Sequence, residues 1–295
     1  MTDLTSMQPV PPFRSESTGP LKKSPRPFVL EPLPNDSVET EHRWYLPCKA
    51  ALEFMIALGL SVLAAPLVVL GALLVKLTSR GPAFYCQTRL GKDGREFTLF
   101  KLRTMVKDAE MLTGPVWADH DDPRITPVGR ILRSGHIDEL PQLLNVLLGQ
   151  MSLIGPRPER PEMVPRLENE LPHYGDRLKV RPGMTGMAQL RLPPDSTLQC
   201  VRRKLVYDLY YVRYVNPWLD ARILLLTFAR LFVDGLKTAW QPLGLPPWET
   251  VAQHVPAAVS AERDGDDTEA GDPSGNWRGP TCSTSHQHAL IKKPR

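Results

Sequence analysis

An apolar segment near the start of the chain constrains its structure more than any other feature. Residues 54–75 form a run of 22 residues without a charged side chain. At about 1.5 Å per residue, a helix of this length can cross the roughly 30 Å hydrocarbon core of a bilayer. A helix buried in a soluble domain is usually shorter. The segment therefore predicts a membrane-associated chain with the lipid bilayer as a partner.

Pro66 lies in the middle of this segment, where a proline removes one helix hydrogen bond and favours a kink. Basic residues stand at both ends of the segment: Arg43, Lys49, Lys76 and Arg80. A spanning helix usually carries more of them on its cytoplasmic side, whereas a helix that bends at Pro66 and returns to the same face would show this symmetry. A re-entrant helix and an ordinary spanning helix with a tolerated proline both remain open.

A second segment, residues 217–240, mixes apolar and charged residues and has a tryptophan near each end. A helix of this kind can lie in the headgroup plane of a membrane. The alternative is a core helix of the globular domain.

Composition divides the chain into four parts. Residues 1–43 and 243–295 are rich in proline and polar residues and predict a disordered arm and a disordered tail. Between them we expect a membrane helix over residues 44–79 and a globular domain over residues 80–242 that includes the helix 217–240. The formal net charge of +4 is small, so we expect no nucleic-acid partner.

Asp138 and Glu139 stand side by side at a predicted helix start, because Pro141 is tolerated only in the first turn of a helix. The leucines that follow at 143, 144, 147 and 148 are expected to pack inward. One interpretation is structural, with Asp138 as the N-cap and Glu139 balancing the helix dipole. The other is chemical, since an ionised carboxylate there can attack phosphorus or hold Mg²⁺.

Basic residues around this pair could hold phosphate groups. Residues 81–99 predict two short strands with a turn at 92–94, and Arg89, Lys101 and Arg103 cluster near a strand end. The turn Gly155-Pro156-Arg157-Pro158 would fix Arg157 at low entropy cost. Further candidates lie in the turn before a helix with two arginines and in a glycine-rich turn: Arg124 and Arg181. Alternatively, the basic cluster is a solvated surface, and the glycine-rich turn is a plain connector.

Together, these residues resemble the bacterial sugar transferase family, the monotopic phosphoglycosyl transferases, over about residues 49–240. The resemblance rests on ordered motifs: Ser79-Arg80-Gly81-Pro82, Gln87-Thr88-Arg89-Leu90-Gly91, Lys101-Leu102-Arg103-Thr104-Met105, Asp122-Pro123-Arg124-Ile125-Thr126, Asp138-Glu139-Leu140-Pro141-Gln142, Met151-Ser152-Leu153-Ile154-Gly155-Pro156-Arg157-Pro158 and Arg181-Pro182-Gly183-Met184-Thr185-Gly186. The chain departs from the family pattern at Ala65, where a serine usually precedes the proline of the membrane helix, at Leu102, where Phe is usual, and at Gln150, where an acidic residue is common.

The resemblance implies an enzyme that moves a sugar 1-phosphate from a nucleotide diphosphate sugar, usually a UDP-sugar, to undecaprenyl phosphate, which starts a surface glycan. It implies Asp138 as the nucleophile of a covalent phosphosugar intermediate, Glu139 as a ligand of Mg²⁺, and Lys101, Arg103 and Arg157 as phosphate-binding residues. It also implies a re-entrant helix broken at Pro66 and a catalytic domain on the cytoplasmic face of the bacterial inner membrane.

We therefore expect a mostly helical α+β protein with a membrane helix, and leave a homo-oligomer open. Two other functions remain as alternatives. One is a Mg²⁺-dependent hydrolase of nucleotide sugars, which would use the same groups with water as acceptor. The other is a non-enzymatic scaffold that recruits glycan-assembly proteins to the membrane. The sequence does not specify the sugar.

Overall fold

The computed structural model describes residues 40–42, 44–109, 122–192, 198–232, 244–256 and 259. Most of the predicted arm, the end of the predicted interfacial helix after residue 232 and most of the predicted tail lie outside them. The helices and strands are α1 (Tyr45–Thr78), β1 (Phe84–Leu90), β2 (Glu96–Leu102), α2 (Pro127–Ser134), α3 (Leu143–Leu147), β3 (Ser152–Ile154), α4 (Val164–Glu170), β4 (Gly183–Thr185), α5 (Met187–Arg191), α6 (Leu198–Tyr214), α7 (Pro217–Phe232) and α8 (Trp248–Gln253), with 3₁₀ turns η1 (Lys92–Gly94), η2 (Ile137–Gln142) and η3 (Tyr174–Lys179). The described part is mostly helical with two small sheets, as expected.

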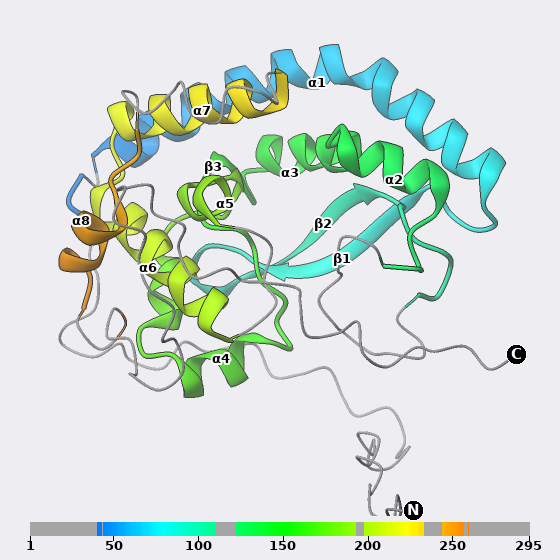
Figure 1. Cartoon of the computed structure of the whole chain (residues 1–295). Helices are drawn as coiled ribbons and strands as arrows, with labels where there is room; N and C mark the ends of the chain where they lie inside the picture. The colour runs from blue at the N-terminus through cyan, green and yellow to red at the C-terminus, as the bar shows by residue number, and fades with distance from the viewer. Residues whose placement is uncertain are drawn as a thin grey trace, which may run out of the picture.

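The apolar segment is one helix, α1, which arches over the rest of the protein in Figure 1. It continues through Pro66, and such curvature is typical of a helix with an internal proline. Many of its large apolar side chains are exposed: Leu52, Phe54, Met55, Leu58, Val62, Leu63, Leu67, Val69, Leu70, Leu73, Leu74 and Leu77. Within the described ranges, α1 is the one helix long and apolar enough to cross a membrane. An apolar surface of this extent is typical of a membrane-associated protein.

The N-terminal end of α1 is bonded to the globular body through a buried network. The Lys49 ammonium lies 2.7 Å from Glu53 Oε1 and 2.7 Å from Asp220 Oδ2 of α7. Glu53 also accepts hydrogen bonds from Ser152 Oγ and, at 3.2 Å, from the Ile154 amide of β3. These buried charges are therefore paired, and they tie α1 to both α7 and β3.

The C-terminal end of α1 is bonded to the same body. Arg103, directly after β2, donates hydrogen bonds to the backbone oxygens of Ser79 at 3.0 Å and Arg80 at 2.6 Å. Gly71 allows α1 to approach the β2 strand closely, since a Cβ there would lie 2.7 Å from Leu102 Cδ1. Both ends of the helix thus contact one folded domain.

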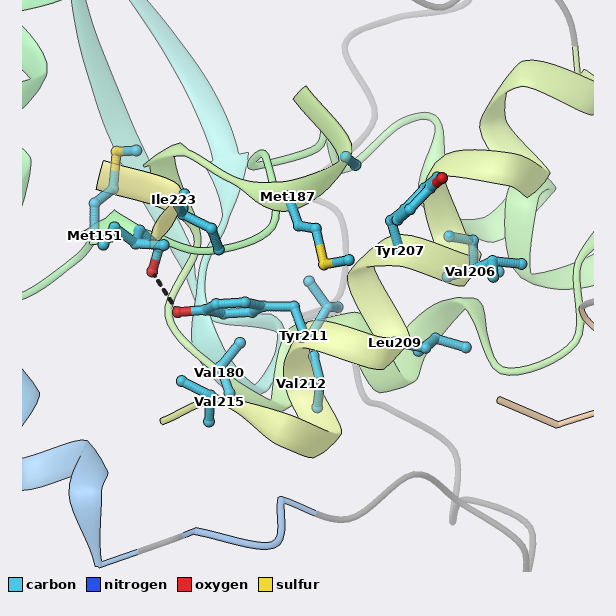
Figure 2. Packing of buried hydrophobic residues seen from close by; sticks show 14 of the residues in the cluster. Met151, Val180, Met187, Val206, Tyr207, Leu209, Tyr211, Val212, Val215 and Ile223 are labelled. Atoms are coloured by element: carbon cyan, nitrogen blue, oxygen red, sulfur yellow. Dashed lines mark hydrogen bonds between the residues drawn. The ribbon is translucent and has the colours of Figure 1, made fainter. Parts of the chain in front are cut away.

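Helix α6 forms the centre of the hydrophobic core. It contributes the buried Leu205, Leu209 and Tyr211, and Met187 of α5 and Met151 before β3 pack around it (Figure 2). The Tyr211 hydroxyl donates to the backbone oxygen of Ile154 at 3.1 Å, so the end of β3 is attached to the core. Each fully buried aliphatic side chain of this kind contributes about 1.5–3 kcal/mol.

The predicted motifs lie in and beside two small sheets. Strands β1 and β2 pair antiparallel, with η1 as the connection that the sequence predicted. Asp93 and Gly94 in this connection have φ angles of 56° and 71°, which Asp and Gly tolerate better than most residues. Strands β3 and β4 pair in parallel, which brings residues 155–158 beside residues 181–186.

The predicted boundary of the folded domain at residue 242 is too early. Leu245, Val251, Val255 and Val259 are buried in the main core. The ring of Trp248 in α8 also packs against Tyr207 of α6, with 5.8 Å between ring centroids. The mostly polar composition of residues 243–295 predicted a disordered tail, although four apolar residues within this range are part of the core.

The segment after Asp138 also differs from the prediction. It begins as the 3₁₀ turn η2 and becomes helical only at α3. Leu143 is buried, but Leu144 and Leu148 are 53% and 64% exposed, so only part of the predicted leucine face packs inward. Figure 1 shows α3 beneath the arch of α1, so these exposed leucines lie on the element next to the membrane helix.

Candidate active site

The Asp138–Glu139 pair lies in the first turn of η2. The residue at the N-cap position is His136, which has a φ of 54°, and no side chain caps the turn. Asp138 is 7% exposed, and within the described residues no group donates a hydrogen bond to its carboxylate. The structural interpretation of Asp138 as an N-cap is therefore wrong, and its carboxylate is available for chemistry.

Glu139 is held by two cations from different parts of the chain. Its Oε1 lies 3.1 Å from Lys101 Nζ of β2 and 3.1 Å from Arg157 Nη2. Burial alone would raise the pKa of Glu139, but Lys101 and Arg157 outweigh it and hold the pKa far below its usual range. Glu139 is therefore ionised at every physiological pH.

The pKa of Asp138 is shifted in the opposite direction. Burial, and then repulsion from the ionised Glu139, raises its pKa from 3.8 to about 6. Lys101, Arg133 and His136 act in the other direction but do not cancel these effects. Two adjacent carboxyl groups thus differ widely in proton affinity, a difference that is common where acid and base roles are divided.

Lys101 reaches the pair from the hairpin. It lies opposite Tyr85 in the antiparallel register, so both side chains project from the same face of the sheet. Burial lowers the pKa of Lys101, and Glu139 opposes that shift. Arg157 approaches from the turn after β3, and its side chain is 48% exposed. Glu139 therefore sits between one partly buried cation, Lys101, and one half-exposed cation, Arg157.

The other predicted phosphate-binding residues lie elsewhere or have other contacts. Arg103 binds the end of α1, and Arg124 forms an ion pair with Asp122 of its own turn. Arg89 bonds to the Gln87 side chain and to the loop that carries Arg157, with Nη1 3.1 Å from the Pro158 oxygen. Arg181 is exposed, with its guanidinium 3.9 Å from the Cβ position of Gly149. Of the six, Lys101 and Arg157 contact the carboxylate pair.

Arg133 was not in the predicted set. Its Nε donates to Thr104 Oγ1 at 2.8 Å, and its charge lowers the pKa of Asp138. It follows Arg130 by three positions on α2, and the sequence offered no signal to choose between the two. In the folded protein Arg133 is close enough to act on the charge of Asp138, whereas Arg130 is exposed.

A divalent cation fits this donor set. Mg²⁺ is usually bound by one or two carboxylates together with substrate phosphates and water. Asp138 and Glu139 offer two, although no group of three acidic, histidine or cysteine ligands occurs within the described residues. The described part of the chain therefore does not form a metal site from protein ligands alone, whereas a site completed by a phosphorylated substrate is compatible with Asp138 and Glu139.

Comparison with known proteins gives a consistent result. A profile described as "Bacterial sugar transferase" matches residues 44–234. A Caulobacter vibrioides protein named UDP-glucose:undecaprenyl-phosphate glucose-1-phosphate transferase is 41% identical over 204 residues, which cover 68% of this chain and 73% of the relative. A Rhizobium leguminosarum protein named exopolysaccharide production protein PSS is 41% identical over 185 residues, 61% of this chain and 92% of the relative.

A third relative is longer. The Aeromonas hydrophila UDP-N-acetylgalactosamine-undecaprenyl-phosphate N-acetylgalactosaminephosphotransferase is 39% identical over 183 residues, which cover 62% of this chain but 43% of the relative. The matched region includes α1, both carboxylates and the two cations that contact Glu139. The chain belongs to the bacterial sugar transferase family, a family of membrane-associated transferase enzymes.

Proposed function

We propose that the protein transfers a sugar 1-phosphate from a nucleotide diphosphate sugar, a UDP-sugar, to undecaprenyl phosphate. The observation that carries the proposal is the buried Asp138 beside Glu139, which Lys101 and Arg157 keep ionised. The names of the relatives support this donor and this acceptor. Those names differ in the sugar, so the sugar of this enzyme is left open.

The transfer proceeds in two displacements at one phosphorus atom. An oxygen of ionised Asp138 attacks the phosphorus that carries the sugar. The bond from that phosphorus to the bridging oxygen of the diphosphate breaks, and the nucleoside monophosphate leaves with the electron pair. A phosphate oxygen of undecaprenyl phosphate then attacks the same phosphorus, and the bond to Asp138 breaks to restore the carboxylate.

The neighbouring residues favour this role for Asp138. A nucleophile must be unprotonated, and a pKa of about 6 leaves most of the Asp138 carboxyl ionised at neutral pH while keeping it poorly solvated. Glu139 pairs with both Lys101 and Arg157 in the free enzyme and holds them next to the place where phosphate oxygens would arrive. Both cations can then donate hydrogen bonds to the diphosphate as charge develops on it.

Asp138 and Glu139 would hold Mg²⁺ together with the diphosphate of the donor. When bound, this ion would neutralise negative charge on the phosphates and on the leaving monophosphate. Glu139 suits the ligand role because it is ionised over the whole pH range in which the enzyme would work.

The arrangement of α1 supports a re-entrant helix on the cytoplasmic face. Lys49 near its start and Ser79 at its end are both bonded to the one globular domain. A straight span would place these ends on opposite sides of a bilayer about 30 Å thick. We expect Trp44→Cys and Arg80→Cys, each in a background without Cys48 and Cys86, to be protected alike from an impermeant maleimide in intact cells.

The test is the release of nucleoside monophosphate by the purified protein in nanodiscs, with Mg²⁺ and a panel of UDP-sugars. A transferase requires undecaprenyl phosphate for steady release, and Asp138→Asn abolishes it while the protein stays folded. Sustained release without the lipid would instead identify a hydrolase. With a donor labelled in the sugar phosphate and no acceptor, the label should stay on the wild-type protein and leave it when the lipid is added.

A further inference from the structure

The loop that carries Arg157 is held through four consecutive backbone oxygens. The Pro156 oxygen accepts from the Gly183 amide at 2.8 Å, and the Glu159 oxygen accepts from the Leu90 amide at 2.9 Å. The two oxygens between them accept from side chains: Arg177 Nη2 lies 2.9 Å from the Arg157 oxygen, and Arg89 Nη1 lies 3.1 Å from the Pro158 oxygen. Donors from three segments of the chain, β1, η3 and β4, therefore fix residues 156–159.

The Arg177 side chain is buried, and its guanidinium forms hydrogen bonds within the folded domain. Its Nη1 donates to the Tyr174 hydroxyl at 2.6 Å, and its Nη2 donates to Asp208 of α6 at 2.7 Å as well as to the Arg157 oxygen. The three side chains Tyr174, Arg177 and Asp208 are each less than a tenth exposed. The fork geometry of a guanidinium lets one side chain serve all these acceptors at once.

Arg89 approaches the loop from the other side. Its Nε and Nη2 both donate to Gln87 Oε1, at 3.1 and 2.6 Å, which sets the plane of the guanidinium and directs Nη1 to the loop. Glu159, the last residue of the held stretch, lies 3.5 Å from Arg89 and 3.8 Å from Arg177, and so connects the two arginines.

We propose that Arg177 and Arg89 are positioning residues that act through Arg157. Neither contacts the carboxylate pair; both bind the backbone of residues 157 and 158, and the half-exposed Arg157 side chain is then aimed at Glu139. A phosphate-binding side chain must be held to within a fraction of an ångström, because displacements of about 1 Å can cost about 100-fold in rate. This inference rests on the proposed transferase function.

A double-mutant cycle tests the proposal. Arg177→Lys keeps a charge for Asp208 but loses the fork, so kcat for monophosphate release should fall by about tenfold while the protein stays folded. In an Arg157→Ala background the same change should alter kcat by less than about twofold, because the side chain that it positions is gone. Equal losses in both backgrounds would show that Arg177 acts elsewhere and would overturn the proposal.

Arg89→Lys provides a second cycle at a position less central to the core, with the same two outcomes. Arg166→Lys is the control, since Arg166 is an exposed residue of α4 that forms an ion pair with Glu170 on the same helix, and the kcat of this variant should equal the wild-type value. Thermal unfolding of every variant separates loss of positioning from loss of fold. Failure of the wild-type protein to release monophosphate from any donor would refute the proposed function instead, before any cycle is measured.

Discussion

Replacing the proposed nucleophile should make the protein more stable while it abolishes transfer. The change of the Asp138 pKa from 3.8 to about 6 means that its ionisation costs the folded state about 3 kcal/mol, at 1.36 kcal/mol per pKa unit. Because the folded pKa is the higher one, stability is greatest while Asp138 is protonated and is lost as the pH rises from about 3.8 through 6. Asparagine has nearly the shape of the protonated acid and never ionises.

Asp138→Asn should therefore raise the free energy of unfolding by about 3 kcal/mol at pH 8 and by about half as much at pH 5. For a folded region of this size, 3 kcal/mol corresponds to an increase in Tm of about 6–12 °C. The assay is thermal unfolding in nanodiscs, followed by tryptophan fluorescence at both pH values. Asp93→Asn is the matched control, because Asp93 is exposed in η1 and asparagine tolerates its positive φ.

An Asp138→Asn protein that is no more stable than wild type at pH 8 would refute this reasoning. So would a gain that stays the same at pH 5, because the effect must follow the ionisation of the carboxyl group. A gain of equal size in Asp93→Asn would show that the assay reports surface charge rather than the buried site.

Three further outcomes are expected. The transfer rate should fall about tenfold per pH unit below pH 6, because only the ionised form of Asp138 attacks phosphorus; a rate that is flat down to pH 5 would contradict this. Glu139→Gln should raise the Mg²⁺ concentration for half-maximal activity, as measured by metal titration, and an unchanged value would exclude Glu139 as a ligand. Glu53→Ala should cost about 3–5 kcal/mol of stability in thermal unfolding, because Ser152 and the Lys49 ammonium lose a buried partner; a cost below about 1 kcal/mol would contradict it.

The sequence predicted those features that depend on local patterns. The apolar length of residues 54–75 predicted α1, and strand-forming residues around a glycine turn predicted β1 and β2. The carboxylate pair was recognised because Asp138 and Glu139 are adjacent and because Pro141 indicates that they stand at a helix start. Lys101 and Arg157 were among the predicted cations, and both contact Glu139.

The partners of the remaining arginines could not be predicted, because tertiary packing sets them. Arg103 was expected at the phosphates because it clusters with Arg89 and Lys101 near a strand end, yet its side chain binds the end of α1. Arg89 has the forked donors that suit a phosphate, but Gln87 and the Pro158 oxygen use them. Leu245 and Val251 looked like part of a polar tail, since only the folded α6 shows where they pack.

The buried contacts of α1 bear on how the protein can be engineered. Lys49 and Glu53 supply partners to Asp220, Ser152 and the Ile154 amide, so the helix completes the interior of the enzyme as well as holding it at the bilayer. Cutting it away to obtain a water-soluble enzyme would leave those partners without their counterparts. A membrane helix grafted from a relative would work only if the residues facing Asp220 and β3 were exchanged with it as a set.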